Sequence, residues 1–258
     1  MVYKTILLIL LSITVNAQIM LNPKRATTLG GGGVAPPDTG TVLLDSLKAY
    51  WAMEDSTDSH GSNDLTNDGG VAFVSGLVNN CGDFEKDIVA HFRIAENAEI
   101  ELSGTTDFTI AFWDSLETVG SQPLFGKYVS YNIQSYTAGV AYPNIRFEVT
   151  PDGVAANLVQ VNSPVGSGWM FVIMWRDNTT DSIYIQVNNG SIVQASYSDV
   201  VFDNNQDFTI GKADGNSATN YDGLMDEFAI WKRVLTVGER TYLYNNGTGR
   251  TYTGGKIQ

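Results

Sequence analysis

The chain has 258 residues, of which 43% are hydrophobic, and its 15 basic and 28 acidic residues give a formal net charge of −13. This composition supports a buried core and excludes a disordered chain, and its single cysteine excludes a disulfide framework. The acidic surface would repel the phosphates of a nucleic acid, so a nucleic-acid partner is not expected.

Residues 1–17 have the pattern of a secretory leader, with Lys4 before a short apolar run and the small residue Ala17 at its end. The apolar run is shorter than the ~20 residues that a membrane-spanning helix needs, so no membrane span is expected. We therefore expect export and removal of the leader. The alternative is that residues 1–17 stay attached as an apolar arm.

Residues 18–41 contain Gly30–Gly33 and Pro36-Pro37 and show no hydrophobic period, which is typical of a linker. The globular domain is expected over residues 42–252, followed by a short tail at residues 253–258. A β-sandwich of this size is commonly one domain.

Strand patterns dominate the body of the chain. Apolar and polar residues alternate in short runs, and residues 169–175 are apolar without interruption, as in a central strand covered on both faces. Asn189-Gly190 is a strong hairpin signal, so residues 169–195 are predicted to form a three-stranded antiparallel meander. Strands are predicted near residues 91–94, 107–113, 145–149, 169–175, 183–187, 191–193, 208–210 and 224–232.

One short helix is predicted near the C-terminus. Thr236 and Glu239 have the spacing of a capping box, Leu243 follows, and Gly247 stands where a C-terminal cap is expected. Many short strands with one helix favour an all-β antiparallel sandwich, and a barrel remains the alternative.

Asp226 lies in a predicted strand, on the same face as Phe228 and Ile230. That face belongs to the core, where a carboxylate is costly unless it is paired or bound to a metal. Two explanations remain open. Asp226 helps to bind a metal ion, or it accepts hydrogen bonds from backbone N–H groups or from an arginine such as Arg233.

Oxygen ligands for a metal are plentiful in an early loop, residues 55–64. Calcium takes six to eight oxygens from carboxylates, amides and carbonyls. We therefore hypothesise that Asp58 and Asn63 of this loop, together with Asp226, hold one structural calcium ion.

Three segments resemble laminin G-like domains of the concanavalin A-like lectin/glucanase superfamily. They are the opening residues 50–65, the strand at residues 107–113 and, most specifically, residues 222–245, which begin Asp-Gly-Leu-Met-Asp-Glu-Phe. The resemblance implies a jelly-roll sandwich of two antiparallel sheets, often with a calcium near Asp58 and Asp226. Members mostly bind glycans or proteins, and similar domains occur in virion proteins.

Glycan-binding modules of this kind use exposed aromatic rings that stack on sugar faces. The aromatic residues in predicted loops are the candidates for this role. The expected ligand-binding residues are Tyr128, Tyr131, Tyr136 and Tyr221, with Tyr142 as a further loop aromatic.

Catalysis is not expected. Glucanases of the superfamily carry Glu-x-Asp-x-x-Glu on one strand, which places alternate carboxylates on the same face. Here Asp226 and Glu227 are adjacent, so they are expected on opposite faces, where they cannot act as a pair. His60 and His91 have no nucleophile motif nearby.

We predict a non-catalytic extracellular module that binds carbohydrate or mediates adhesion, with a glycan or a cell-surface protein as its partner. The alternative is a structural subunit of an extracellular assembly: a virion decoration or fibre protein, or a filament subunit. In that case residues 1–41 would dock into a neighbouring subunit, and the protein would lie at a virion surface.

Overall fold

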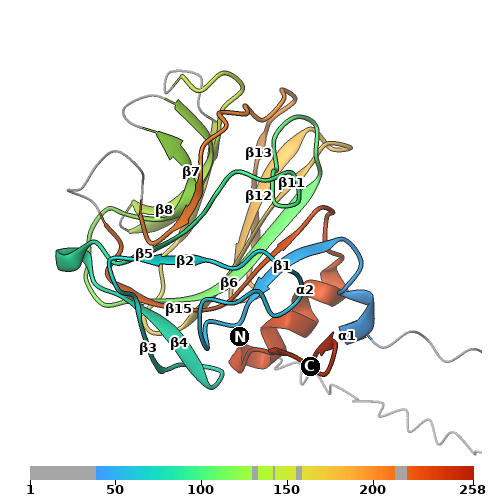
Figure 1. The fold of residues 1–258 in the computed structure, drawn as a ribbon. Coiled ribbons are helices and arrows are strands. Elements are labelled where there is room, and N and C mark those ends of the chain that lie inside the picture. Colours follow the sequence, from blue (N-terminus) through green and yellow to red (C-terminus); the bar gives the residue numbers. More distant parts are fainter. Residues whose placement is uncertain (1–38, 130–132, 142, 155–158, 213–219) are drawn as a thin grey trace, which may run out of the picture. The chain divides into compact units, whose positions relative to one another are not determined.

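The computed structural model describes residues 39–129, 133–141, 143–154, 159–212 and 220–258 (Figure 1), but not the side chains of residues 128–137 and 159. The chain divides into two units, residues 1–36 and 37–258, and all described elements belong to the second. The expected leader and most of the linker therefore lie outside the described residues.

Two antiparallel sheets form the sandwich (Figure 1). The eight-stranded sheet has the order β13 (Ile192–Ser196), β12 (Ser182–Val187), β11 (Met170–Asp177), β6 (Phe108–Leu116), β15 (Gly223–Trp231), β4 (Asn80–Phe84), β3 (Ala72–Ser75), and β1 (Leu47–Trp51) also pairs with β15. The seven-stranded sheet has the order β10 (Val159–Pro164), β9 (Asn144–Val149), β8 (Ile133–Ala141), β7 (Gln122–Val129), β14 (Phe208–Ile210), β5 (His91–Ile94), β2 (Thr66–Asp68). This is the expected all-β jelly-roll sandwich rather than a barrel, and β11–β12–β13 are the expected meander.

The main core fills the space between the sheets, where the ring of Phe228 lies 5.2 Å from that of Phe112 and 5.3 Å from that of Phe125. A second apolar cluster, which includes Trp113 and Trp231, covers the outer face of the eight-stranded sheet, the face directed away from the other sheet. The residues of β11 alternate between the two clusters, which explains its uninterrupted apolar sequence.

Helix α2 (Val237–Tyr244) packs over the outer face of the eight-stranded sheet. The predicted capping box is present, because Thr236 accepts from the amide of Glu239 and the Glu239 carboxylate accepts from the amide of Thr236. The C-terminal cap is Asn245, with φ of 46°, and not Gly247 as expected. Asparagine tolerates the left-handed region, so the helix can end two residues earlier.

Both ends of the second unit pack against the same outer cluster. Helix α1 (Thr39–Val42) begins before residue 42, and the hairpin of β16 (Tyr252–Thr253) and β17 (Lys256–Ile257) extends past residue 252. Ile257 is fully buried, and a Cβ on Gly40 would lie 2.1 Å from its carbonyl oxygen. The packed body therefore includes the end of the expected linker and most of the expected tail.

Two short 3₁₀ turns complete the described elements, η1 (Lys86–Ile88) and η3 (Asn245–Gly247). None of the helices in the described part of the chain is both long and apolar enough to cross a membrane.

Candidate functional site

A β-bulge in the middle of β15 brings two carboxylates to the outer face of the eight-stranded sheet. The first half of β15 pairs with β4 and its second half with β1, and the register with β6 shifts between Asp226 and Ala229. Glu227, with φ of 53°, occupies the shift. The bulge leaves Met225 and Phe228 in the main core, and Asp226 and Glu227 turn to the opposite side.

Because of this bulge, two of the expectations from the sequence are wrong. Asp226 does not share a face with Phe228 and Ile230, and Asp226 and Glu227 do not point to opposite faces. The extra residue of a bulge reverses the alternation on which both expectations were based.

The bonds of the two carboxylates are directed to backbone and to Tyr50. Oδ2 of Asp226 accepts from the amides of Leu77 (3.1 Å) and Val78 (2.9 Å), whereas its buried Oδ1 has no hydrogen-bond partner among the described residues. Oε2 of Glu227 contacts the hydroxyl of Tyr50. Asp226 is 0% exposed and Glu227 is 5% exposed, so neither is accessible to a sugar in this conformation.

Burial changes the protonation of this pair. Desolvation raises the pKa of Asp226 to about 7, although the two amides act in the opposite direction. The pKa of Glu227 is also raised, by burial and then by the neighbouring charge of Asp226. Two adjacent buried carboxylates are therefore favoured in a neutral form or beside a cation.

Asp58 and Asn63, two of the three expected calcium ligands, lie together in the early loop. Oδ1 of Asp58 accepts from the amides of Tyr50 and His60, both at 3.0 Å, and its Oδ2 accepts from the amide of Asn63. The side chain of Asn63 donates to the carbonyl of Lys48. Asp58 and Asn63 thus hold the loop in place.

Oδ2 of Asp226 has the partners of the alternative explanation, backbone N–H groups, whereas its Oδ1 has none among the described residues. The other suggested partner, Arg233, instead forms an ion pair with Glu239 at 2.6 Å. A shallow pocket of about 340 Å³ beside this ion pair is lined by Val42 and Thr236 among others, and its charged groups are already paired.

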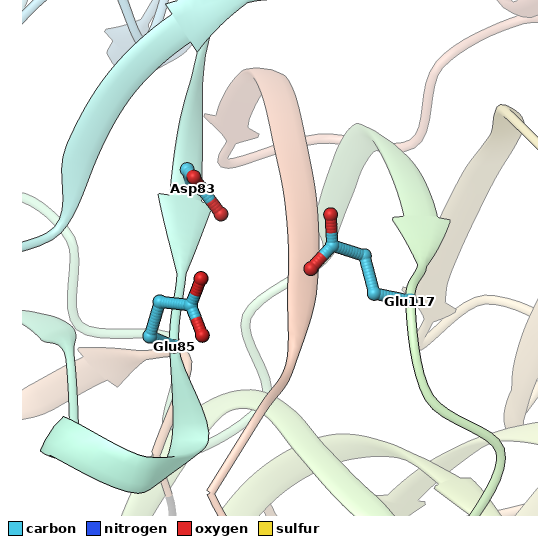
Figure 2. A group of neighbouring side chains, drawn as sticks. All are labelled: Asp83, Glu85 and Glu117. Carbon is cyan, nitrogen blue, oxygen red and sulfur yellow. The ribbon is translucent and has the colours of Figure 1, made fainter.

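Two other acidic clusters lie within the described residues. Asp83, Glu85 and Glu117 direct their carboxylates toward one another from either side of β15 (Figure 2), with one oxygen of each within 4.8 Å of the others. Asp83 is half-buried, but Glu85 and Glu117 are exposed, and exposed acids of this kind are common without a metal. Burial and the two neighbouring acids raise the pKa of Glu117.

The second acidic cluster already contains a cation. The ammonium of Lys127, only 2% exposed, contacts Glu96 and Glu101 and lies 3.8 Å from Asp203. Sequence reasoning missed this cluster because its four members come from separate segments and no motif links them.

The expected ligand-binding tyrosines divide into two groups. Tyr221 is fully buried: its ring packs 5.6 Å from that of Phe84, and its hydroxyl donates to Oδ1 of Asp114 at 2.5 Å. The expectation that Tyr221 is an exposed ligand contact is therefore wrong. Tyr131 and Tyr142 lie outside the described residues, and the side chains of Tyr128 on β7 and Tyr136 on β8 do as well.

Asp114, the partner of Tyr221, is a buried carboxylate that was not predicted from the sequence. It is 0% exposed, and desolvation raises its pKa to about 7. A signal was present, because Phe108, Ile110 and Phe112 point to the core and the next position in that alternation is Asp114.

Cys81 is an inert buried residue. Burial and then the charge of Asp226 raise the pKa of its thiol to about 12, so it is protonated at neutral pH. The two histidines have structural contacts: Nδ1 of His91 is 2.8 Å from the carbonyl oxygen of Val89, and the ring of His60 packs on Tyr252.

Comparison with known proteins agrees with this architecture. A family model described as the concanavalin A-like lectin/glucanases superfamily matches residues 90–239, more than half of the chain. A search among curated proteins finds no significant match.

Several solved structures are similar. The binding domain of Paraclostridial Mosquitocidal Protein 1 has a TM-score of 0.66 at 19% identity, and the binding domain of botulinum neurotoxin DC in complex with rat synaptotagmin II has 0.63 at 13%; each match covers 79% of this chain and 52% of the other. Domain 4 of the extracellular arabinanase AbnA from Geobacillus stearothermophilus, in complex with arabinotriose, has a TM-score of 0.54 at 17% identity. This match covers 76% of this chain and 97% of the other. The chain spans about half the length of the toxin domains. At such identities the likeness concerns the fold.

Proposed function

Because the chain belongs to the concanavalin A-like lectin/glucanase superfamily, we propose that it is a non-catalytic carbohydrate-binding module. The observation that carries this proposal is a concentration of tyrosines in one short segment of the sequence. Four of the 12 tyrosines lie within residues 128–142, which include the β7–β8 hairpin of the seven-stranded sheet. Tyrosine rings are suited to stacking on sugar faces, and their hydroxyls to hydrogen bonding with sugar hydroxyls.

The described part of the chain has no freely exposed aromatic ring outside this hairpin that could bind a sugar. Its large apolar side chains with more than a third of their surface exposed are all isoleucine or valine, so no described aromatic ring is freely exposed. The similar domain 4 of AbnA was solved with arabinotriose, and a botulinum binding domain was solved in complex with SialylT. Both support a glycan as the ligand.

The same proposal includes that the module has no catalytic activity. A glycosidase needs two carboxylates that reach the scissile bond, about 5–10 Å apart. Asp226 and Glu227 are buried against backbone and Tyr50, which supports a structural role. Location outside the cell rests on the leader pattern of residues 1–17.

Binding of the full chain to a glycan array, followed by titration of the best glycan, tests the proposal. We expect Tyr128→Ala, Tyr131→Ala and Tyr136→Ala each to weaken binding about tenfold, a change of about 1.4 kcal/mol. Tyr184→Ala, on the opposite sheet, is the matched control and should bind normally. Absence of any glycan ligand, or unchanged affinity in all three variants, would contradict the proposal.

We further propose that the calcium expected from the family binds at the bulge. Oδ1 of Asp226 is buried without a partner, and Glu54 lies near enough to raise the pKa of Asp226 while its own carboxylate accepts from the amide of Asn80. A divalent cation there would offset the burial of Asp226 and Glu227. Asp58 and Asn63 are left out of this set, because Asp58 accepts from backbone amides of β1 and of its own loop and Asn63 donates to the carbonyl of Lys48.

Calcium added to chelated protein should then raise the melting temperature, with heat of binding in calorimetry. Asp226→Asn should abolish both effects. Asp83→Asn, in the exposed cluster of Figure 2, should leave them unchanged. If the wild-type protein shows neither effect, or if only Asp83→Asn removes them, calcium does not bind at the bulge.

A further inference from the structure

One segment, residues 249–258, passes over the buried carboxylates of the bulge, and we call it the strap. Oε2 of Glu227 contacts the hydroxyl of Tyr50, which lies 2.9 Å from the carbonyl oxygen of Arg250 in the strap. Thr251 lies close enough to the Glu227 carboxylate to lower its pKa by hydrogen bonding, against the larger effect of burial. The strap is therefore part of what buries Glu227.

The strap also packs on the segment that binds Asp226. A Cβ on Gly249, the first residue of the strap, would lie 2.8 Å from Cγ2 of Val78 and 3.1 Å from Nε1 of Trp113. The amide of Val78 donates to Oδ2 of Asp226 at 2.9 Å. Glycine permits this close approach because it has no Cβ. Both carboxylates of the bulge thus lie beneath or beside the strap.

Two attachments hold the strap against helices α1 and α2 (Figure 1). Near its start, Arg250 donates to the carbonyl of Tyr242 at 2.6 Å, and its guanidinium carbon lies 3.6 Å from the centre of the Tyr242 ring. Near its end, Ile257 is fully buried in the outer cluster, beside Gly40 of α1. Between the two attachments, residues 253–255 are exposed.

The strap is separate from the two main sheets. Its strands β16 and β17 pair with each other, and neither pairs with any other described strand. Local opening of a small unit breaks few buried contacts, so it costs less free energy than unfolding of the whole domain. Release of the strap breaks its two attachments and its contacts with Tyr50 and Glu227, and it leaves the strand pairs of the sandwich intact.

We propose that the strap is a built-in cover, and that its local release, with the sandwich intact, is the route by which solutes reach Asp226 and Glu227. The other walls of this site belong to the folded body, namely Tyr50 on β1 and the backbone of residues 77–78. The strap would then control the entry and release of the calcium proposed at the bulge. This regulatory role rests on the proposed calcium, whereas the shielding of the two carboxylates does not.

Carbodiimide labelling of carboxyl groups tests the proposal without calcium. The full chain is labelled in the presence of an amine nucleophile, and peptide mass mapping gives the rate at each carboxyl group. In the wild-type protein we expect Glu227 to react at least about tenfold more slowly than Asp45, whose side chain is 77% exposed. Asp114, which is fully buried on the inner side of the same sheet, reports unfolding of the sandwich.

Two variants loosen different attachments of the strap. Ile257→Ala removes the buried end, and Arg250→Met removes the hydrogen bond to α2. We expect each to raise the labelling rate of Glu227 about tenfold or more, because loss of a buried contact favours the open form, while the rate at Asp114 stays unchanged. Ile185→Ala, the same substitution at a buried position of β12, is the matched control and should not favour Glu227 over Asp114.

Three results would overturn this cover. One is a wild-type protein in which Glu227 reacts as fast as Asp45. Another is an unchanged rate at Glu227 in both strap variants. The third is an equal increase at Glu227 and Asp114, which would show that unfolding of the sandwich is the route. If calcium does not bind, the proposed calcium site fails, and the labelling rates still decide whether the strap shields the two carboxylates.

Discussion

The hydroxyl of Tyr50, on β1, lies between Oε2 of Glu227 and the carbonyl oxygen of Arg250, 2.9 Å from the latter. A tyrosine has one hydroxyl hydrogen and cannot donate fully to two acceptors. Both contacts are hydrogen bonds when Glu227 is protonated and donates to Tyr50, which agrees with its raised pKa. Tyr50 thereby connects β1, the bulge of β15 and the C-terminal segment.

Removing this hydroxyl should destabilise the fold. Tyr50→Phe removes a buried partner of Glu227 and of the Arg250 carbonyl, and we expect a loss of about 1–3 kcal/mol in the free energy of unfolding. Urea denaturation of Tyr50→Phe, Glu227→Gln and the double variant measures the coupling between the two residues, expected at about 0.5–3 kcal/mol. Strictly additive losses would show that they do not interact.

Asp114 should make the stability fall as pH rises. Its pKa is about 7 in the folded chain and about 4 in an unfolded one. Between these values the folded state binds the extra proton, so the stabilisation is complete below pH ~4 and is lost up to pH ~7, at about 1.4 kcal/mol per pH unit.

Asp114→Asn tests this dependence. The amide cannot ionise, so the variant should gain stability relative to wild type between pH 5 and pH 8, as measured by chemical denaturation. Asp226 titrates in the same window, so a reduced slope remains in the variant. Parallel pH profiles for the two proteins would contradict a buried neutral Asp114.

Lys127 should be more important than a surface lysine. Lys127→Met leaves Glu96 and Glu101 without their cation, and we expect a loss of about 3–5 kcal/mol at pH 7. The defect should shrink at pH 4, where the glutamates take up protons. Adding Glu96→Gln and Glu101→Gln to Lys127→Met should restore much of the stability; no recovery would indicate that packing, not charge, dominates.

The capping box should contribute measurably to α2. Thr236→Ala removes the acceptor for the amide of Glu239, and we expect a loss of about 1 kcal/mol. Thr236→Ser keeps the hydroxyl and should lose much less. Thermal denaturation compares the two, and equal losses would show that the cap contributes nothing.

Sequence periodicity was sufficient to predict most of the fold. Phe108, Ile110 and Phe112 were predicted on one face and lie in the main core, and the start of α2 was predicted from Thr236 and Glu239. These features depend on residues close together in the chain, where propensity and alternation act directly.

The site could be predicted only in part, because one backbone conformation is not visible in the sequence. Glu227 adopts φ of 53°, a region that a glutamate seldom occupies, and this single bulge places Asp226 and Glu227 on the same side. The burial of Tyr221 depends in the same way on a distant partner, Asp114.

The alternating strands, the capped helix and the family were thus readable from the residues alone, because each rests on local pattern. The partners of the buried polar groups were decided by tertiary packing: Asp226 with residues 77–78, Tyr50 with Glu227, and Lys127 with Glu96 and Glu101. A buried charge must find a partner wherever the fold places one, and the two sheets bring together segments that are far apart in the chain.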